Sequence, residues 1–350
     1  MALVLLLTSP LAANENKSAT TSSKTLLLKT PSAYPTALPG LGTVLPRVAK
    51  QVDLMSRGSL KMKIYEPGKL VAPFEILEAV SSGKVNSGYS TAGYWGGKIP
   101  ASPLFTAVPF GPEAGEYMAW LYYGNGMKLY QEMYQQAGYD IHVIPCAMVA
   151  PETSGWFSKE INSLEDLQGL KIRFFGLGGK VLQRLGAAVS LIPGRDIYPA
   201  LEKGSIDATE FATPAIDQRL GFQKIVKFNY FPGWHQQGTV IELLVNKKVW
   251  DGMSTQHQAI LTNACKASMA DSYAEGEAIQ YGAMIKNVEK HGVQIKDWSP
   301  EMLDAFRKTW DEIALEESKK DAYFAKVWAD MSKFREGYKL WKSHAFLPRK

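Results

Sequence analysis

The chain has 350 residues, of which 46% are hydrophobic and 21% charged, and its formal net charge is +5. These values exclude a disordered chain and favour two globular lobes, at roughly 100 to 200 residues per domain. The basic excess is spread along the sequence without a basic run that could follow a phosphate backbone, so nucleic acid is not an expected partner.

The N-terminal residues suggest export. Residues 9–13 read Ser-Pro-Leu-Ala-Ala, which is typical of the small-residue end of a secretory signal peptide, and a polar stretch follows through Lys24. The basic segment expected before it is missing. Two interpretations stay open: residues 1–23 are a signal remnant, with a mature chain that begins near Asn14 outside the cytoplasm, or they are a disordered N-terminus. The longest apolar stretch near the start, 2–7, is far shorter than the ~20 residues of a membrane-spanning helix.

From Thr25 onward the hydrophobic pattern alternates between strand and helix periods, which predicts βαβ units with parallel strands. In the first half we expect strands at 25–30, 60–65, 86–91 and 139–148, and helices at 41–54, 74–82 and, interrupted near 124–126, within 113–137.

A second set of units is expected from residue 151. A capping box at 163–166 predicts a short helix, and the elements expected after it are strands at 170–174, 188–192 and 206–211, a turn at 176–179, and helices at 181–185 and 197–203. Residues 79–87 and 200–208 echo each other as helix, glycine and strand. Gly83 and Gly204 fit the left-handed position that ends a helix, and the echo predicts two lobes of similar construction.

The apolar strand expected at 239–245 is predicted to cross back to the first lobe. Helical patterns follow it. Thr255 with Gln258 is predicted to cap a helix to Lys290, which would span about 50 Å and touch both lobes.

Ser299, Pro300 and Glu301 combine a cap, a proline at the first helical position and an acid in the first turn, which predicts a helix to residue 317. A last helix is expected at 321–341. Its aromatic residues either pack on the chain's own core or cover another subunit; they are Tyr323, Phe324, Trp328, Phe334, Tyr338 and Trp341.

Sequence motifs for enzymatic chemistry are absent: there is no phosphate-binding P-loop, no zinc-protease helix and no nucleophile elbow. The glycines at 176–179 lack the spacing of a dinucleotide fingerprint and are interpreted as a tight turn. The five histidines, at 142, 235, 257, 291 and 344, lack metal-ligand spacing, and most are interpreted as surface or satisfied core residues. The two cysteines, Cys146 and Cys265, are too few for a thiolate zinc site but could pair with each other.

Candidate ligand-binding residues lie at strand ends, where open α/β sheets present their ligands. Arg173 ends a predicted strand among aromatic residues, and its guanidinium suits a carboxylate; a structural ion pair is the alternative. Glu152 and Glu210 lie in apolar surroundings, where a carboxylate needs a cation or hydrogen-bond donors. From the residues alone, capping or a helix-end role competes with metal ligation.

A set of motifs in order along the chain gives a specific resemblance. They lie at residues 91–98, 108–111, 155–157, 169–173, 178–181, 208–211 and 232–234. Together they resemble the extracytoplasmic solute receptors of TRAP (tripartite ATP-independent periplasmic) transporters, closest to the branch that binds 2-oxo acids. The similarity extends from about Lys24 to the C-terminus.

The resemblance implies an α/β clamshell of two lobes, with a long helix spanning both and a helical C-terminus. The expected divisions are lobe I at 24–150 with a return strand at 239–250, lobe II at 151–238, the spanning helix at 251–290 and C-terminal helices at 291–350. It also implies a periplasmic protein that delivers its solute to a sodium-driven permease. The branch forms homodimers through an exchanged C-terminal helix.

The resemblance assigns site residues as well. Arg173 matches the arginine that pairs with the solute carboxylate. A cation bridges protein and solute in this branch, and the matching positions are Glu152, Glu210, the Phe211 backbone carbonyl and Gln236. The branch carries glutamine and glutamate where this chain has Glu152 and Gln236, an exchange that conserves charge.

Charge counting favours calcium over sodium. Two glutamates and a solute carboxylate carry three negative charges, which Arg173 and a divalent cation neutralise, and an all-oxygen shell suits a hard cation. Tyr94, Trp95 and Phe110 are expected to wall the pocket and restrict it to short aliphatic tails; core packing is the alternative for all three.

The predicted function is therefore a binding protein, not an enzyme, for a small 2-oxo or 2-hydroxy monocarboxylate such as pyruvate or lactate, with a bridging metal. One alternative is a receptor for a larger or aromatic carboxylate. Another is a metal-dependent lyase or hydrolase that uses Glu152 and Glu210 as acid and base.

Overall fold

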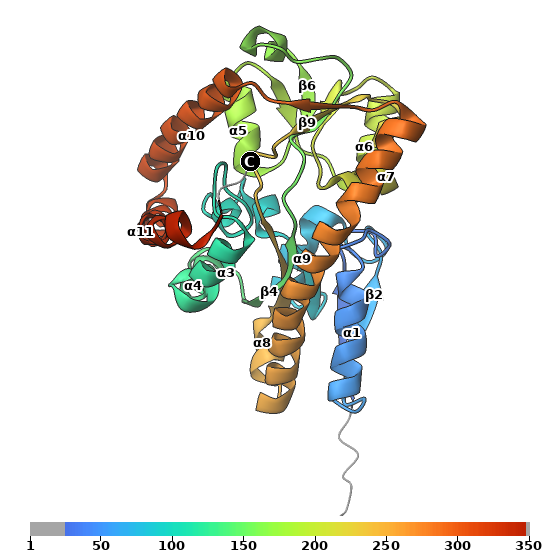
Figure 1. Ribbon diagram of the computed structural model, residues 1–350. Coiled ribbons are helices and arrows are strands. Elements are labelled where there is room, and N and C mark those ends of the chain that lie inside the picture. Colours follow the sequence, from blue (N-terminus) through green and yellow to red (C-terminus); the bar gives the residue numbers. More distant parts are fainter. Residues whose placement is uncertain (1–24, 348–350) are drawn as a thin grey trace, which may run out of the picture.

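The computed structural model describes residues 25–347. The signal remnant predicted at 1–23 lies outside the described residues. Within 25–347, no helix combines the length and the apolar character that crossing a membrane requires. The described chain forms two lobes of mixed α/β structure (Figure 1), which confirms the predicted fold class. The exact lobe boundaries stay predictions.

The first lobe is built on two small sheets. In one, β1 (Leu26–Pro31) pairs in parallel with β2 (Leu60–Tyr65). In the other, β10 (Thr239–Asn246) lies between β3 (Ser87–Ser90) and β4 (Ile141–Val149) and is antiparallel to both. Every residue of β10 is buried, as its apolar sequence predicts, and it returns to this lobe as expected. The helices here are α1 (Val44–Met55), α2 (Ile76–Ser81), α3 (Ala114–Tyr123), α4 (Gly126–Gln136) and α8 (Lys247–Asp251).

The second lobe is built on a six-stranded sheet of order β11-β9-β5-β8-β6-β7. Its strands are β5 (Gly155–Phe157), β6 (Lys171–Arg173), β7 (Ala188–Ser190), β8 (Ala208–Thr209), β9 (Phe228–Phe231) and β11 (Gln294–Asp297), and its helices are α5 (Gly176–Arg184), α6 (Gly194–Glu202) and α7 (Pro214–Leu220). β6 is parallel to β7 and β8, whereas β5 is antiparallel to both neighbours. The predicted parallel pairing therefore holds only in part of each lobe.

Several local predictions are confirmed. Ser163 and Asp166 form the predicted capping box of the short helix η4. Gly83 and Gly204 follow α2 and α6 with φ angles of 77° and 67°, so both occupy the left-handed conformation expected after a helix. The short 3-10 helices of the chain are η1 (Pro73–Glu75), η2 (Ala92–Trp95), η3 (Ser102–Phe105), η4 (Leu164–Leu167) and η5 (Phe222–Lys224).

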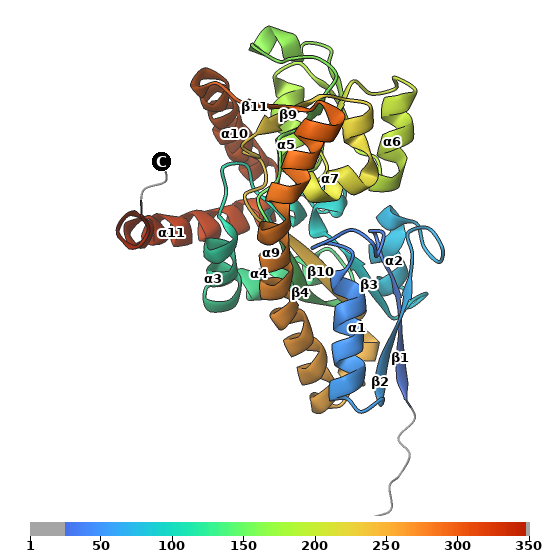
Figure 2. The ribbon, with the colours of Figure 1, turned by 45° about the vertical axis from the view of Figure 1, so that its right-hand side comes forward.

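The long helix α9 (Thr255–His291) runs beside both lobes (Figures 1 and 2). It contacts α1 and β4 in the first lobe and α7 in the second. Its N-cap is Ser254, whose hydroxyl accepts a hydrogen bond from the His257 N–H at 3.1 Å, so the predicted Thr255 cap is wrong by one position. A disulfide between Cys146 and Cys265 joins α9 to β4.

The C-terminal helices α10 (Pro300–Lys320) and α11 (Ala322–Ala345) link the lobes on another side. α10 packs on α5 of the second lobe, and α11 packs on α3 and α4 of the first. The first part of α11 covers its own core, since Phe324, Val327 and Met331 are fully buried. Its last part does not: Trp341 is 62% exposed. The first half of the aromatic stripe thus packs on the chain's own core, and coverage of another subunit by the second half stays a prediction.

The structure differs from the predicted elements in two ways. Residues 176–179 are the first turn of α5 and not a separate turn. The sequence also missed β5, β9, α7, α8 and β11. β11 is largely exposed and polar, and its strand conformation comes from pairing with β9, which no local pattern predicts.

Candidate functional site

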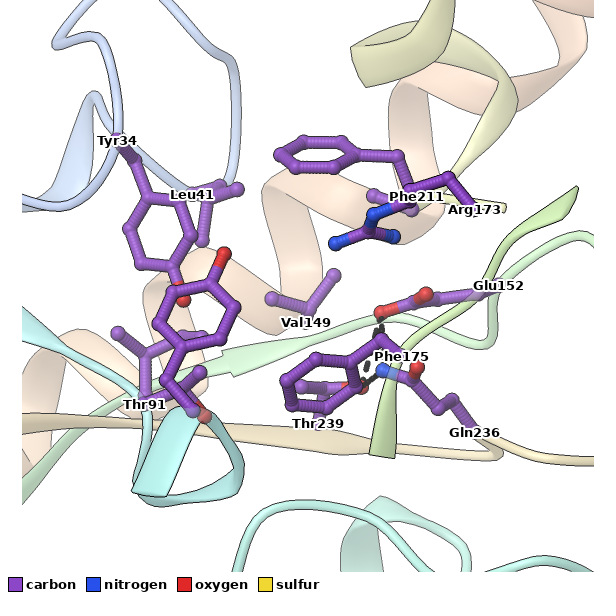
Figure 3. A pocket seen from close by; sticks show the side chains of 13 residues that line it. Tyr34, Leu41, Thr91, Val149, Glu152, Arg173, Phe175, Phe211, Gln236 and Thr239 are labelled. Carbon is purple, nitrogen blue, oxygen red and sulfur yellow. Dashed lines mark hydrogen bonds between the residues drawn. The ribbon is translucent and has the colours of Figure 1, made fainter. Parts of the chain in front are cut away.

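A small cavity lies between the lobes (Figure 3). The space open to the centre of a water-sized sphere is about 30 Å³, and one water needs about 10–15 Å³ by this measure. The cavity therefore suits a compact occupant. Its lining residues are Tyr34, Leu41, Thr91, Tyr94, Val149, Glu152, Arg173, Phe175, Phe211, Ala212, Gln236, Thr239 and Ile241.

Arg173 ends β6 and reaches the cavity with a side chain only 1% exposed. Its Nη1 donates to the carbonyl of Glu210 and, at 2.9 Å, to the Glu210 Oε2 atom. Its Nε donates to the Ile192 carbonyl at 3.3 Å, and the guanidinium lies 5.2 Å from the centre of the Phe211 ring. Nη2 makes no hydrogen bond to any of residues 25–347, so this edge of the fork is available to a ligand in the cavity.

Glu210 follows β8 and is completely buried. Its Oε2 atom also accepts a hydrogen bond from the Phe175 N–H at 3.0 Å. Burial alone would raise the pKa of Glu210, but the charge of Arg173 and the contact of His235 outweigh burial and lower that pKa. The carboxylate is therefore held in its ionised form.

Glu152 comes just after β4, at the start of the chain's crossing into the second lobe. Its Oε1 atom accepts hydrogen bonds from Gln236 Nε2 and Thr239 Oγ1, both at 2.9 Å. Burial and then the negative charge of Glu210 hold the pKa of Glu152 well above its ordinary value. Ligand atoms of Glu152 and Glu210 lie within 4.8 Å of each other, so ionising both carboxylates costs free energy unless a positive charge lies beside them.

Several buried side-chain atoms that lack hydrogen-bond partners lie at this point. Within the described chain they include Glu152 Oε2, Glu210 Oε1, Gln236 Oε1 and both ring nitrogens of His235. One ligand atom from each of Glu152, Glu210 and His235 can be chosen so that all lie within 4.8 Å of one another. Unpartnered buried oxygens cost free energy unless something satisfies them. This donor set fits a metal cation.

His235 is the site residue that the sequence interpretation set aside. It is 1% exposed, and its Nε2 lies 3.5 Å from Glu210 Oε1, so it is neither a surface nor a satisfied core histidine. Close packing holds it in place: a Cβ at Gly178 in α5 would lie 2.7 Å from the His235 Cβ. Its position next to Gln236 was the one available signal.

Of the three aromatic residues predicted to wall the pocket, one lines the cavity and two do not. Tyr94 lines the cavity together with Tyr34, which the sequence did not single out. Trp95 and Phe110 do not line it, which corrects the expectation for both. Trp95 points into the first lobe, where its Nε1 donates to Glu242 Oε1 at 3.0 Å. Phe110 faces a separate surface depression beside α10.

Phe211 contributes its ring to the cavity wall. The role predicted for its backbone carbonyl as a cation ligand stays a prediction.

Glu242 is a further fully buried carboxylate, which the sequence analysis did not single out. It lies on β10, where a register irregularity between Ile241 and Glu242 marks the pairing with β4. Besides Trp95, the hydroxyls of Tyr130 and Tyr134 donate to it. Burial raises the pKa of Glu242 to about 7. Because both oxygens have partners, this carboxylate belongs to the core and not to the cation site.

Comparison with known proteins gives one family and several close relatives. Residues 40–321 match the family described as bacterial extracellular solute-binding protein, family 7. The chain is 36% identical over 303 residues to a monocarboxylate 2-oxoacid-binding periplasmic protein of Nostoc sp., covering 86% of this chain and 82% of that one.

Two solved structures are also similar. A TRAP periplasmic solute-binding protein of Pseudoalteromonas atlantica, with bound sodium and pyruvate, is 34% identical with a TM-score of 0.88, covering 92% of this chain and 97% of that one. A TRAP transporter solute-binding protein of Bordetella bronchiseptica is 31% identical with a TM-score of 0.88, covering 91% and 94%. It is a mixed-occupancy dimer with copurified calcium and picolinate in one site and an apo second site.

Proposed function

The chain belongs to family 7 of the bacterial extracellular solute-binding proteins, which serve TRAP transporters, and we propose that it binds a small 2-oxo or 2-hydroxy monocarboxylate together with a metal cation. Pyruvate and lactate are the representative solutes. The family consists of transport receptors and not enzymes, so the lyase or hydrolase alternative is set aside. The proposed chemistry is binding and release without a covalent step.

One observation carries this proposal: a buried arginine and the residues of two unpartnered oxygens, Glu152 and Gln236, line the same cavity, and Glu210 offers a carboxylate oxygen within 4.8 Å of one of Glu152. Arg173 would bind the solute carboxylate through its free guanidinium edge, because a charged donor held in a dry site binds an anion more strongly than one in water. Glu152 Oε2, Glu210 Oε1 and Gln236 Oε1 lack partners within the described chain, and they would hold the cation. The 2-oxo or 2-hydroxy oxygen of the solute would complete its shell.

Charge balance supports calcium as the preferred cation. Glu152, Glu210 and a bound carboxylate would place three negative charges around Arg173, and a divalent ion neutralises them. Glu152 would then lose the proton that its raised pKa favours, since the cation replaces it as the compensating charge. The relatives support both ions, since calcium accompanies picolinate in one and sodium accompanies pyruvate in another.

The dimensions of the cavity support a short solute. Its apolar wall is formed by Leu41, Val149, Ile241 and the rings of Phe175 and Phe211, which leaves little room beyond a methyl or ethyl tail. A larger or aromatic carboxylate is the second candidate, and the picolinate of the Bordetella bronchiseptica relative is the observation that favours it. Accepting such a solute requires the lobes to stand further apart than they do here.

A thermal-shift and calorimetry screen tests the proposal. Chelator-treated protein is titrated with pyruvate, lactate, a dicarboxylate and picolinate, each with calcium, with sodium chloride or with a potassium salt alone. We expect the largest stabilisation from pyruvate or lactate with calcium. Stronger binding of picolinate would favour the second candidate, and no response to any monocarboxylate would refute the proposal.

The family also bears on where the protein acts and with what. We propose a periplasmic receptor that delivers its solute to a sodium-driven TRAP permease and forms a homodimer through α11. The exposed end of α11 supports the dimer, since Leu340 is 71% and Trp341 62% exposed and apolar surface of this kind marks association sites. Light scattering during size-exclusion chromatography should give a dimer for the native chain and a monomer for Trp341→Glu. A native monomer would refute this part.

A further inference from the structure

Phe175 follows β6 and performs two separate tasks in the site. Its backbone N–H donates to the Oε2 atom of Glu210 at 3.0 Å. Its ring lines the cavity (Figure 3). The ring also reaches the first lobe, where it meets the ring of Tyr94 edge to face, with centroids 5.4 Å apart and planes at 83°. One residue thus touches a candidate cation ligand through its backbone and the opposite lobe through its side chain.

The opposite lobe receives this ring at Gly93 in η2. A Cβ added at Gly93 would lie 2.2 Å from the Phe175 Cζ atom, and its three nearest neighbours would all be atoms of the Phe175 ring. The Gly93 backbone cannot easily retreat, because its N–H donates to the buried Thr106 Oγ1 at 2.7 Å. Gly93 does not have the positive φ that would itself demand glycine. Glycine is therefore explained at position 93 by the space that the Phe175 ring occupies beside it.

A second contact closes the lobes elsewhere. Arg195, in α6 of the second lobe, donates through Nη1 to the carbonyl of Pro67 in the first at 3.1 Å. This contact involves an exposed arginine and has no link to the cation ligands. Of these two contacts, the one between Phe175 and Gly93 is buried, and it shares a residue with the site.

We propose that Phe175 couples joint occupation of the site, by the cation and the solute together, to closure of the two lobes. This proposal rests on the proposed function. A cation and a solute fix Glu210 and Arg173, and the hydrogen bond from Phe175 then fixes the β6–α5 junction with the ring directed at Gly93. Contact of the Phe175 ring with Gly93 favours the closed form, in which the solute is enclosed between the lobes. The apparent affinity for solute then depends on the population of the closed form.

Gly93→Ala tests the coupling without altering any cation or solute ligand. We expect the Kd for pyruvate, measured by calorimetry at saturating calcium, to rise about ten-fold or more, because the closed form becomes poorly populated. Calcium affinity without pyruvate should change by less than about two-fold, and pyruvate should no longer reduce the radius of gyration in X-ray scattering. Gly97→Ala is the matched control, since a Cβ there meets no atom within 4 Å, and it should behave as the native chain.

A double-mutant cycle separates coupling from general damage to the fold. In Phe175→Ala the N–H to Glu210 remains but the ring is gone, so this variant should also lose pyruvate affinity and closure while keeping calcium binding. Adding Gly93→Ala to it should change the pyruvate Kd by less than about two-fold, because the clash needs the ring. Native pyruvate affinity and closure in either single variant, or additive losses in the double variant, would overturn the coupling. A native chain that binds no monocarboxylate would instead refute the proposed function.

Discussion

Replacing Arg173 with alanine tests the role of the guanidinium in solute binding. The side chains of Arg173 and Glu210 are 1% and 0% exposed, with Nη1 and Oε2 separated by 2.9 Å. Arg173→Ala also removes the buried guanidinium that would pair with the pyruvate carboxylate. Losing one partner of such a pair weakens solute binding by about 2–5 kcal/mol, which corresponds to a rise of roughly 30- to 5,000-fold in the pyruvate Kd.

The same substitution affects stability, because it leaves Glu210 buried without its arginine. Breaking a buried ion pair in this way costs about 3–5 kcal/mol of unfolding free energy. Calcium should restore part of that loss in Arg173→Ala, since a cation beside Glu210 replaces the missing charge. Chemical unfolding with and without calcium measures this effect, and circular dichroism establishes that the variant is folded at the temperature of the calorimetry.

Two further variants separate the charge of Arg173 from its geometry and from the general effect of losing an arginine. Arg173→Lys keeps the charge beside Glu210 but loses the planar fork, so it should recover stability better than pyruvate affinity. Arg184→Ala is the control: it breaks the Arg184–Glu316 pair at 2.8 Å, in which both side chains are about 40% exposed, and exposed pairs contribute little. If folded Arg173→Ala binds pyruvate within two-fold of the native chain, Arg173 does not bind the carboxylate.

Three other predictions concern the cation, the pH dependence and the disulfide. Glu152→Gln removes one ligand charge and should weaken calcium binding by about ten-fold or more in calorimetry, with a smaller effect on sodium; equal losses for both ions would contradict the charge argument. The pKa of Glu242 is raised from 4.5 to about 7, so the folded protein binds this proton more tightly than the unfolded chain does. The contribution of Glu242 to stability is therefore full below pH 4.5, falls as the pH rises to about 7, and stays constant above that pH. The native chain should therefore lose roughly 3 kcal/mol relative to Glu242→Gln between pH 4 and 8 in urea unfolding, and parallel stability curves would contradict this. Cys146 and Cys265 close a loop with a sequence separation of 119, so a reductant should lower the unfolding free energy by about 2–5 kcal/mol, whereas a double alanine variant should not respond to it.

The sequence predicted elements that carry a local hydrophobic pattern and missed several short ones, among them strands defined by tertiary pairing. β2 matches its predicted bounds because its alternation of apolar and lysine residues is local information. β11 was missed because its exposed polar residues take strand conformation only beside β9. Residues 176–179 were interpreted as a turn because glycines commonly mark turns, whereas the small size of Gly178 serves close packing against His235.

Part of the candidate site could be predicted from its own residues, and part, including Gln236, only from the family resemblance. Glu152, Arg173 and Gln236 line one cavity, although the first and last of them are far apart in the sequence. Trp95 is predicted to wall the pocket together with Tyr94, but these neighbouring residues of η2 point in different directions, and Trp95 faces Glu242. His235 carries no motif, and its relevance comes from the distance to Glu210.

The most direct measurement of the central claim is a crystal structure of the protein with pyruvate and calcium. We predict an ion between Glu152 Oε2 and Glu210 Oε1, bridged to the solute, and a pyruvate carboxylate paired with the Arg173 guanidinium. Pyruvate bound elsewhere, or bound in the cavity with no ion between the two glutamates, would contradict the account.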